Sequence, residues 1–159
     1  MARQTFFSFR YKKDNWRASI VRNSWVTQKD REAPGFFDSA EWEEVKKKTD
    51  SAIETWIDGQ LNGTSVTVVL IGADTAGKKW IKYEIESSHK KGNGMLGIYI
   101  HNIKDKDGNT AVKGNNPFDN FEFKKNLKIV TCPVYEWVAD NGNKNMGDWI
   151  EKAAKAAGK

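Results

Sequence analysis

Cysteine, histidine and long apolar runs are scarce in this 159-residue sequence, and each scarcity excludes a class of protein. Cys132 is the one cysteine, so the chain cannot build an internal disulfide framework, and with two histidines it lacks the ligands of a cysteine-built zinc site. No apolar run approaches the roughly 20 residues that span a bilayer, and the polar start lacks the apolar segment of a signal peptide. We therefore expect a cytoplasmic protein without a metal site and without a membrane partner.

The charge of the chain is basic but evenly spread. Twenty-six lysines and arginines against 21 aspartates and glutamates leave a net charge of +5 and a sequence pI of about 9.2. Acidic and basic residues are interspersed along the whole chain and no nucleic-acid-reading motif accompanies them, so we expect no nucleic-acid partner. The sequence holds no repeat, low-complexity segment or linker, and its length suffices to bury a core. These features predict one domain over residues 1–159.

Strand and helix patterns alternate along the chain. Four segments have the apolar, β-branched or aromatic composition of buried strands, namely Thr5–Phe9, Val66–Ile71, Leu96–Ile100 and Leu127–Thr131. A further short strand is possible at Phe36-Phe37, within an irregular stretch. Helical patterns begin at an Asp14 cap, at a Ser51–Glu54 capping box, before Trp80 and near Asn145. This order predicts an α/β fold with a central, mostly parallel five-stranded sheet and helices on both faces.

Ligands bind such a sheet outside the carboxyl ends of its strands, where the strand order reverses. The segments expected there are Ser8–Asn15, Asp38, the turn Gly72–Gly77 and the loop after His101. Ser8 could bond a ribose or a phosphate, and the aromatic rings around it could stack on a base. Alternation does not decide which of the phenylalanines in the first strand face the core.

Charged residues near the first helix have competing interpretations. Arg17 could bind a phosphate of a dinucleotide, whereas Asp14 could simply cap the helix. Lys12 and Lys13 are expected to be solvated. The glycine-bounded turn at Gly72–Gly77 could cradle a phosphate, but it has neither the dinucleotide-binding fingerprint nor the Walker spacing, and we interpret it chiefly as a turn.

Glu84 stands apart from the other acidic residues by its helical neighbours. Positions three and four residues away on either side carry no cation, so nothing on its own helix pairs with it, and it borders an apolar face. Glu86, in contrast, has Lys82 and Lys90 four residues away on each side, the pattern of a solvated surface. Glu84 is therefore either a partly exposed carboxylate at the flank of a helix or a functional one.

Several stretches, read in order, resemble one known family. They are FFSFRYKKDNWRASIVRN at Phe6–Asn23, DSAIETWID at Asp50–Asp58, VTVVLIGADTAGKKWIKYEI at Val66–Ile85, GIYIH at Gly97–His101 and NPF at Asn116–Phe118. Together they resemble the TIR-like family of bacterial defence proteins, most closely the TIR proteins of Thoeris anti-phage systems. The resemblance covers nearly the whole chain and keeps its order.

This resemblance implies a flavodoxin-like TIR fold and an enzyme that consumes NAD as substrate, with no cofactor. It implies release of nicotinamide and closure of the remaining ADP-ribose into a cyclic isomer, a diffusible signal that a separate effector protein senses. A phage-derived activator and self-association through TIR contacts are further implied partners. The essential glutamate of the family lies in a W-I-x-Y-E motif, which places it at Glu84. The alternative is a non-catalytic TIR scaffold in defence signalling.

The chemistry suits a site with one carboxylate. Breaking the bond between nicotinamide and ribose builds positive charge on the sugar, and a carboxylate aimed at the ribose stabilises that charge. Nicotinamide needs no general acid, because its departure neutralises its own charge. We expect Glu84 to be catalytic and the substrate-binding residues to be Phe6, Ser8, Phe9, Tyr11, Asn15, Arg17, Asp38 and Trp80.

Overall fold

The computed structural model describes residues 4–26, 44–121, 123–125, 128–130 and 132–159. Its main sheet is parallel and has the strand order β1, β2, β3, β6, with bounds Thr5–Ser8, Val66–Ile71, Gly94–Tyr99 and Val134–Glu136. The helices are α1 (Tyr11–Val26), α3 (Asp50–Leu61), α4 (Lys79–Lys91) and α5 (Gly142–Ala156). The predicted α/β architecture is confirmed, with four strands of this sheet in the described residues where the sequence predicts five. Phe36-Phe37 and Asp38 lie outside those residues.

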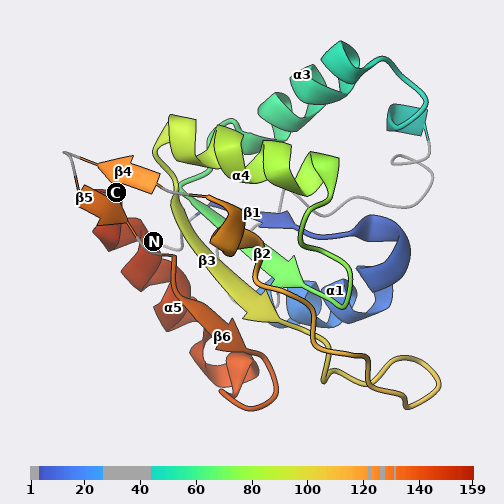
Figure 1. Ribbon diagram of the computed structural model, residues 1–159. Helices are drawn as coiled ribbons and strands as arrows, with labels where there is room; N and C mark the ends of the chain where they lie inside the picture. Colours follow the sequence, from blue (N-terminus) through green and yellow to red (C-terminus); the bar gives the residue numbers. More distant parts are fainter. Residues whose placement is uncertain (1–3, 27–43, 122, 126–127, 131) are drawn as a thin grey trace.

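Helices cover both faces of the sheet (Figure 1). Alternate residues of the strands point to opposite faces. On one face, Phe7, Val68 and Ile98 pack with residues of α1 and α5 in the largest apolar cluster. On the other face, Val69 and Ile71 pack against Ile81 and Ile85 of α4, and Phe6 packs against α3. Val66–Ile71 is entirely buried between its neighbours, as its unbroken apolar sequence predicts.

The prediction of a parallel strand at Leu127–Thr131 is wrong for the residues of this segment that the structure describes, Lys128–Val130. Within it, β5 (Lys128–Val130) pairs antiparallel with β4 (Phe123–Lys125) in a separate two-stranded sheet. The fourth parallel strand is β6, which begins after Pro133, whose carbonyl accepts a hydrogen bond from the Gly97 N–H. Apolar composition indicates a strand but does not select its partner.

Two helices begin earlier than the capping signals predict. The first bond of α1 runs from the Asp14 N–H to the Arg10 carbonyl at 2.9 Å, so Asp14 lies in the first turn and is not the N-cap. The N-cap of α3 is Thr49, whose side chain accepts from the Ala52 N–H, and not Ser51. In both cases a competing residue a few positions upstream starts the helix. None of the helices in the described ranges is long and apolar enough to cross a membrane.

A buried polar seam fixes α4 on the sheet. The hydroxyls of Thr67 in β2 and Ser88 in α4 lie 2.7 Å apart, and Ser88 also donates to the Glu84 carbonyl at 2.6 Å. Asn93 donates to the Thr67 hydroxyl at 3.2 Å and to the Thr64 hydroxyl at 2.9 Å. Because buried polar groups are costly without partners, these bonds set the rotation and the height of the helix above the strands.

Candidate active site

Glu84 lies on the face of α4 that packs against the sheet. Its neighbours on that face are Ile81, Ile85 and Ser88, and Glu84 itself is 9% exposed. The hydroxyl of Ser8, the last residue of β1, donates a hydrogen bond to the Glu84 carboxylate. Ser8 ends its strand, so the pair lies at the carboxyl edge of the parallel sheet, where ligands bind in folds of this type. Glu86, by contrast, is exposed.

The environment of Glu84 favours a neutral carboxyl group. Burial raises its pKa from 4.5 to about 8, against the smaller opposing effect of the Ser8 hydrogen bond. Within the described part of the chain, no lysine or arginine forms an ion pair with it. A buried carboxyl group without a cation partner becomes ionised readily when a positive charge enters beside it. This site can therefore accept and stabilise a cation.

The raised pKa predicts how Glu84 affects stability. The folded state holds the Glu84 proton up to about pH 8, whereas the unfolded chain releases it near 4.5, so the unfolded state binds fewer protons between these values and stability falls as the pH rises. Glu84→Gln has no proton to lose. Its free energy of unfolding should exceed that of the wild type at about pH 9, by at most about 5 kcal/mol, with little difference at about pH 4.

Urea unfolding of both proteins across this range tests the prediction, because all other titrating groups cancel in the difference. A difference that does not grow with pH would contradict the raised pKa. Glu86→Gln, the same substitution at an exposed position of the same helix, is the control for effects that do not come from the Glu84 site.

The predicted binding residues are distributed over several environments. Phe6 lies in the core with Ile53 and Ile57 of α3, whereas Phe9 and Tyr11 belong to the core on the other face, with ring centroids 5.9 Å apart. Asn15 is exposed on α1. The Ser8 side chain donates a hydrogen bond to the Glu84 carboxylate, so the structure brings this predicted binding residue together with Glu84.

Trp80 precedes Glu84 by one turn of α4 and faces α3. It contacts Tyr83 edge-on, and both rings line a surface groove of about 390 Å³ beside Glu54 and Lys79. Glu84 is not among the residues that line this groove. The structure therefore separates the Trp80 ring from the buried carboxyl group, although both lie on one helix.

Arg17 holds the loop that follows β3. Its Nε donates to the Ile103 carbonyl at 2.6 Å and its Nη2 donates to the Asn109 carbonyl at 2.9 Å. The Asp105 carboxylate lies 4.0 Å from the same guanidinium group. Arg17 is only 9% exposed, so these contacts engage a buried side chain. In this structure its donors fix the loop at the carboxyl end of the sheet.

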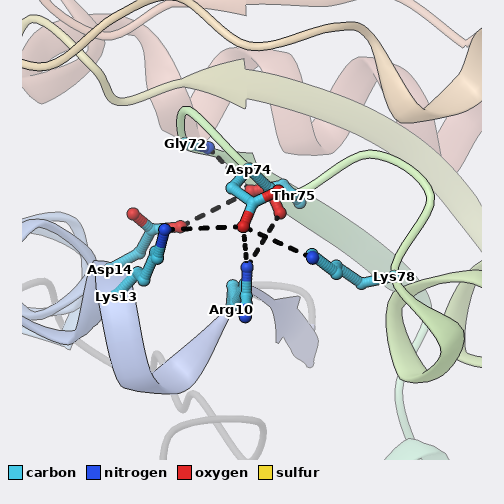
Figure 2. Close-up of polar contacts among 7 residues, drawn as sticks. All are labelled: Arg10, Lys13, Asp14, Gly72, Asp74, Thr75 and Lys78. Carbon is cyan, nitrogen blue, oxygen red and sulfur yellow. Dashed lines mark hydrogen bonds and ion pairs between the residues drawn. The ribbon is translucent and has the colours of Figure 1, made fainter.

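A charge cluster that the sequence analysis missed lies at the same edge of the sheet (Figure 2). Arg10 forms an ion pair with the Asp74 carboxylate, and Lys13 and Lys78 lie 3.5 and 3.3 Å from the same oxygen, Oδ2. Desolvation is the largest single effect on Asp74 and raises its pKa, but the Lys78 hydrogen bond and the charges of Arg10, Lys78 and Lys13 together lower the pKa below 3.8. Asp74 is thus an ionised acid between three cations.

The turn that carries Asp74 is held from beneath by other residues. The Thr75 hydroxyl accepts from the Gly72 N–H at 2.8 Å and lies 3.4 Å from the Asp14 carboxylate, to which it donates. Asp14 is 5% exposed, and burial raises its pKa against the effects of Arg17, Thr75, Arg10 and Lys13. A Cβ at Gly72 would lie 2.3 Å from the Asp14 carboxylate, so this close approach requires glycine.

One signal could have located this cluster. The sequence predicts a solvated Lys13 and a turn at Gly72–Gly77, but both segments follow parallel strands, β1 and β2, which are neighbours in the sheet. Residues after neighbouring parallel strands meet at one edge. The charges of the two segments, Arg10 and Lys13 in one and Asp74 and Lys78 in the other, are therefore brought together by topology.

Comparison with known proteins places the chain in a family. The family model described as "Thoeris protein ThsB, TIR-like domain" matches residues 6–105, which include Ser8, Glu84 and the cluster around Asp74. A protein of Bacillus cereus (strain MSX-D12), named "Putative cyclic ADP-D-ribose synthase ThsB1", is 45% identical over 152 residues, which cover 95% of this chain and 76% of the relative. The flavodoxin-like TIR fold expected from the resemblance is thereby confirmed. The chain belongs to the family of Thoeris ThsB proteins with a TIR-like domain.

Proposed function

We propose that this chain cleaves NAD, releases nicotinamide and closes the remaining ADP-ribose into a cyclic isomer. The observation that carries the proposal is the buried Glu84–Ser8 pair at the carboxyl edge of the sheet, a carboxyl group without a cation partner in the described residues. The name of the Bacillus cereus relative, a cyclic ADP-D-ribose synthase, supports the same reaction.

The proposed role of Glu84 is to stabilise positive charge on the ribose. NAD brings a cationic nicotinamide ring into the site, and its charge lowers the pKa of Glu84, so that the carboxyl group ionises as substrate binds. As the glycosidic bond breaks, nicotinamide takes the bonding electron pair and leaves neutral, and the positive charge moves to the ribose. A carboxylate held in a water-poor site stabilises that charge more strongly than one in solvent.

Ser8 is proposed to position this carboxylate. Its hydroxyl holds one Glu84 oxygen, which leaves the second oxygen available to a ribose hydroxyl or to the reacting sugar. Both residues lie on secondary structure, β1 and α4, and the seam at Thr67 and Ser88 fixes the helix. Catalytic groups on rigid elements keep their geometry through the reaction.

Cyclisation is distinguished from hydrolysis by the nucleophile that reaches the ribose. A group on the adenine or on the second ribose of the same molecule must arrive before water does, which requires a folded dinucleotide and exclusion of solvent. We further propose that the cyclic product is a signal for a separate effector protein, and that a phage component or self-association stimulates the reaction.

The test is incubation of the purified chain with NAD, with and without lysate from phage-infected cells. We expect nicotinamide release together with a product one water lighter than ADP-ribose, the mass that distinguishes closure from hydrolysis. Release of ADP-ribose alone would contradict cyclisation. Absence of nicotinamide under both conditions would contradict the proposed activity and would favour the scaffold alternative.

A further inference from the structure

Three cations converge on one oxygen of Asp74 at the edge of the sheet where the proposed substrate binds. Side-chain exposures of 29% for Arg10, 42% for Lys78 and 60% for Lys13 leave them accessible from solvent, and Asp74 is 40% exposed. Exposed ion pairs contribute little to stability, because solvent and salt screen them. The three cations also repel one another, so their grouping requires an anion between them.

Hydrogen bonds that do not involve the Asp74 side chain also hold this turn. The Gly72 N–H, the Thr75 hydroxyl and the buried Asp14 form their own bonds beneath it, and Asp14 is anchored in α1. Figure 2 shows the Asp74 carboxylate directed toward Arg10, Lys13 and Lys78, whereas Thr75 is directed toward Asp14 and Gly72. Asp74 can therefore be displaced from the cations while the turn keeps its conformation.

The cations around Asp74 and the nearby N-terminus of α4 favour an anion that carries more negative charge than one carboxylate. Asp74 supplies one negative charge against three positive ones, and the N-cap of α4, Lys78, makes no side-chain capping hydrogen bond, so the positive end of this helix lacks a cap. The first turn of α4 holds no acidic residue. Helix N-termini with nearby cations favour phosphate groups.

The position of the cluster relative to Glu84 matches the spacing between the nicotinamide ribose and the pyrophosphate of NAD. Arg10 follows Ser8, the partner of Glu84, by two residues, a backbone reach of at most about 7 Å. In NAD the ribose that carries nicotinamide is joined to the pyrophosphate through a single methylene group. A ribose at Glu84 would thus place its phosphate near Arg10.

We infer that Arg10, Lys13 and Lys78 form the subsite for the pyrophosphate of the substrate, and that Asp74 occupies this subsite as an internal anion until substrate displaces it. The inference rests on the proposed function for its identification of the ligand. An internal occupant lowers the apparent affinity for the substrate by the fraction of molecules in which it is seated. NAD consumption by the unstimulated protein is reduced accordingly.

The experiment measures binding of inorganic pyrophosphate by calorimetry to wild type, Asp74→Asn and Asp50→Asn. Asp74→Asn should bind pyrophosphate at least about fivefold more tightly than wild type, because it removes the competing charge and keeps the shape. Asp50 is the matched control, since it pairs with Lys79, also at the start of α4, but faces no second cation in the described residues. Asp50→Asn should bind as wild type does.

Two further variants complete the test. Lys78→Gln leaves Asp74 in place and should weaken pyrophosphate binding about fivefold, a result that does not depend on the Asp74 variant. The double variant Arg10→Gln, Asp74→Asn should lose the tighter pyrophosphate binding expected of Asp74→Asn alone. Pyrophosphate binding that is unchanged in Asp74→Asn or in Lys78→Gln, or a gain that survives Arg10→Gln, would overturn the inference.

Measurements of NAD cleavage by the same variants test the anion subsite and the proposed activity separately. Asp74→Asn should lower the KM for NAD about fivefold with little change in kcat, because the internal anion competes with substrate binding. If pyrophosphate binds as expected but no variant cleaves NAD, the anion subsite stands and the proposed activity fails. If NAD is cleaved while pyrophosphate binding is equal in all variants, the activity stands and the inference fails.

Discussion

Replacing Glu84 by glutamine should lower the rate of NAD cleavage at least about a hundredfold while the protein remains folded. Glutamine preserves the shape of the side chain and can still accept from Ser8, but it cannot supply the negative charge that the ribose requires as nicotinamide departs. The measurement is nicotinamide release at saturating NAD under the conditions that activate the wild type. The loss should appear in kcat, because the charge develops in the transition state.

The matched control for this experiment is Glu86→Gln. This glutamate lies two residues away on the same helix, is exposed, and should be replaceable with less than about a twofold change in rate. Wild-type activity in Glu84→Gln would remove Glu84 from the reaction. Equal losses in both variants would point to a general effect on α4.

Replacing Gly94 by alanine should destabilise the fold by about 3 kcal/mol. Gly94 begins β3, and a Cβ there would lie 2.2 Å from the Ala153 carbonyl oxygen and 2.5 Å from its carbon, both backbone atoms of α5. Backbone atoms cannot rotate away as a side chain can, so α5 must move off the sheet. Urea unfolding followed by circular dichroism measures the change in the free energy of unfolding.

Gly59→Ala is the corresponding control. Gly59 lies inside α3, and a Cβ there meets no atom within 4 Å. Alanine should raise the free energy of unfolding by about 0.5–1 kcal/mol, because it restricts the unfolded chain and favours the helix. The same substitution should therefore have opposite signs at the two positions. A stability of Gly94→Ala equal to that of the wild type would show that β3 and α5 are packed less closely.

Sequence patterns predict those parts of the fold in which one physical requirement dominates. The run Val66–Ile71 is apolar at almost every position because both of its faces are covered, and this composition is visible without a structure. The sequence pattern also singles out Glu84, because no cation lies three or four residues away from it on its helix, but only the family resemblance implies a catalytic role for it. Its burial and its pKa need the sheet beneath it.

Features that depend on partners distant in the sequence are not predicted. The strand at Lys128–Val130 is recognisable by composition, but its pairing with Phe123–Lys125 rather than with β3 is a choice between two partners. Asp74 and Lys13 are separated by 61 residues and are polar residues in turns, so nothing local distinguishes them from solvated charges. Their contact arises from the adjacency of β1 and β2.

The polar seam beneath α4 divides the site into a fixed part and an adjustable part. If α4 turned or slid along β2, the buried hydroxyls of Thr67 and Ser88 and the amide of Asn93 would lose their hydrogen-bond partners. The carboxyl group of Glu84 therefore keeps a fixed position relative to the sheet. Changes in the turns around Glu84 can alter what reaches its carboxyl group without changing how α4 is held on the sheet.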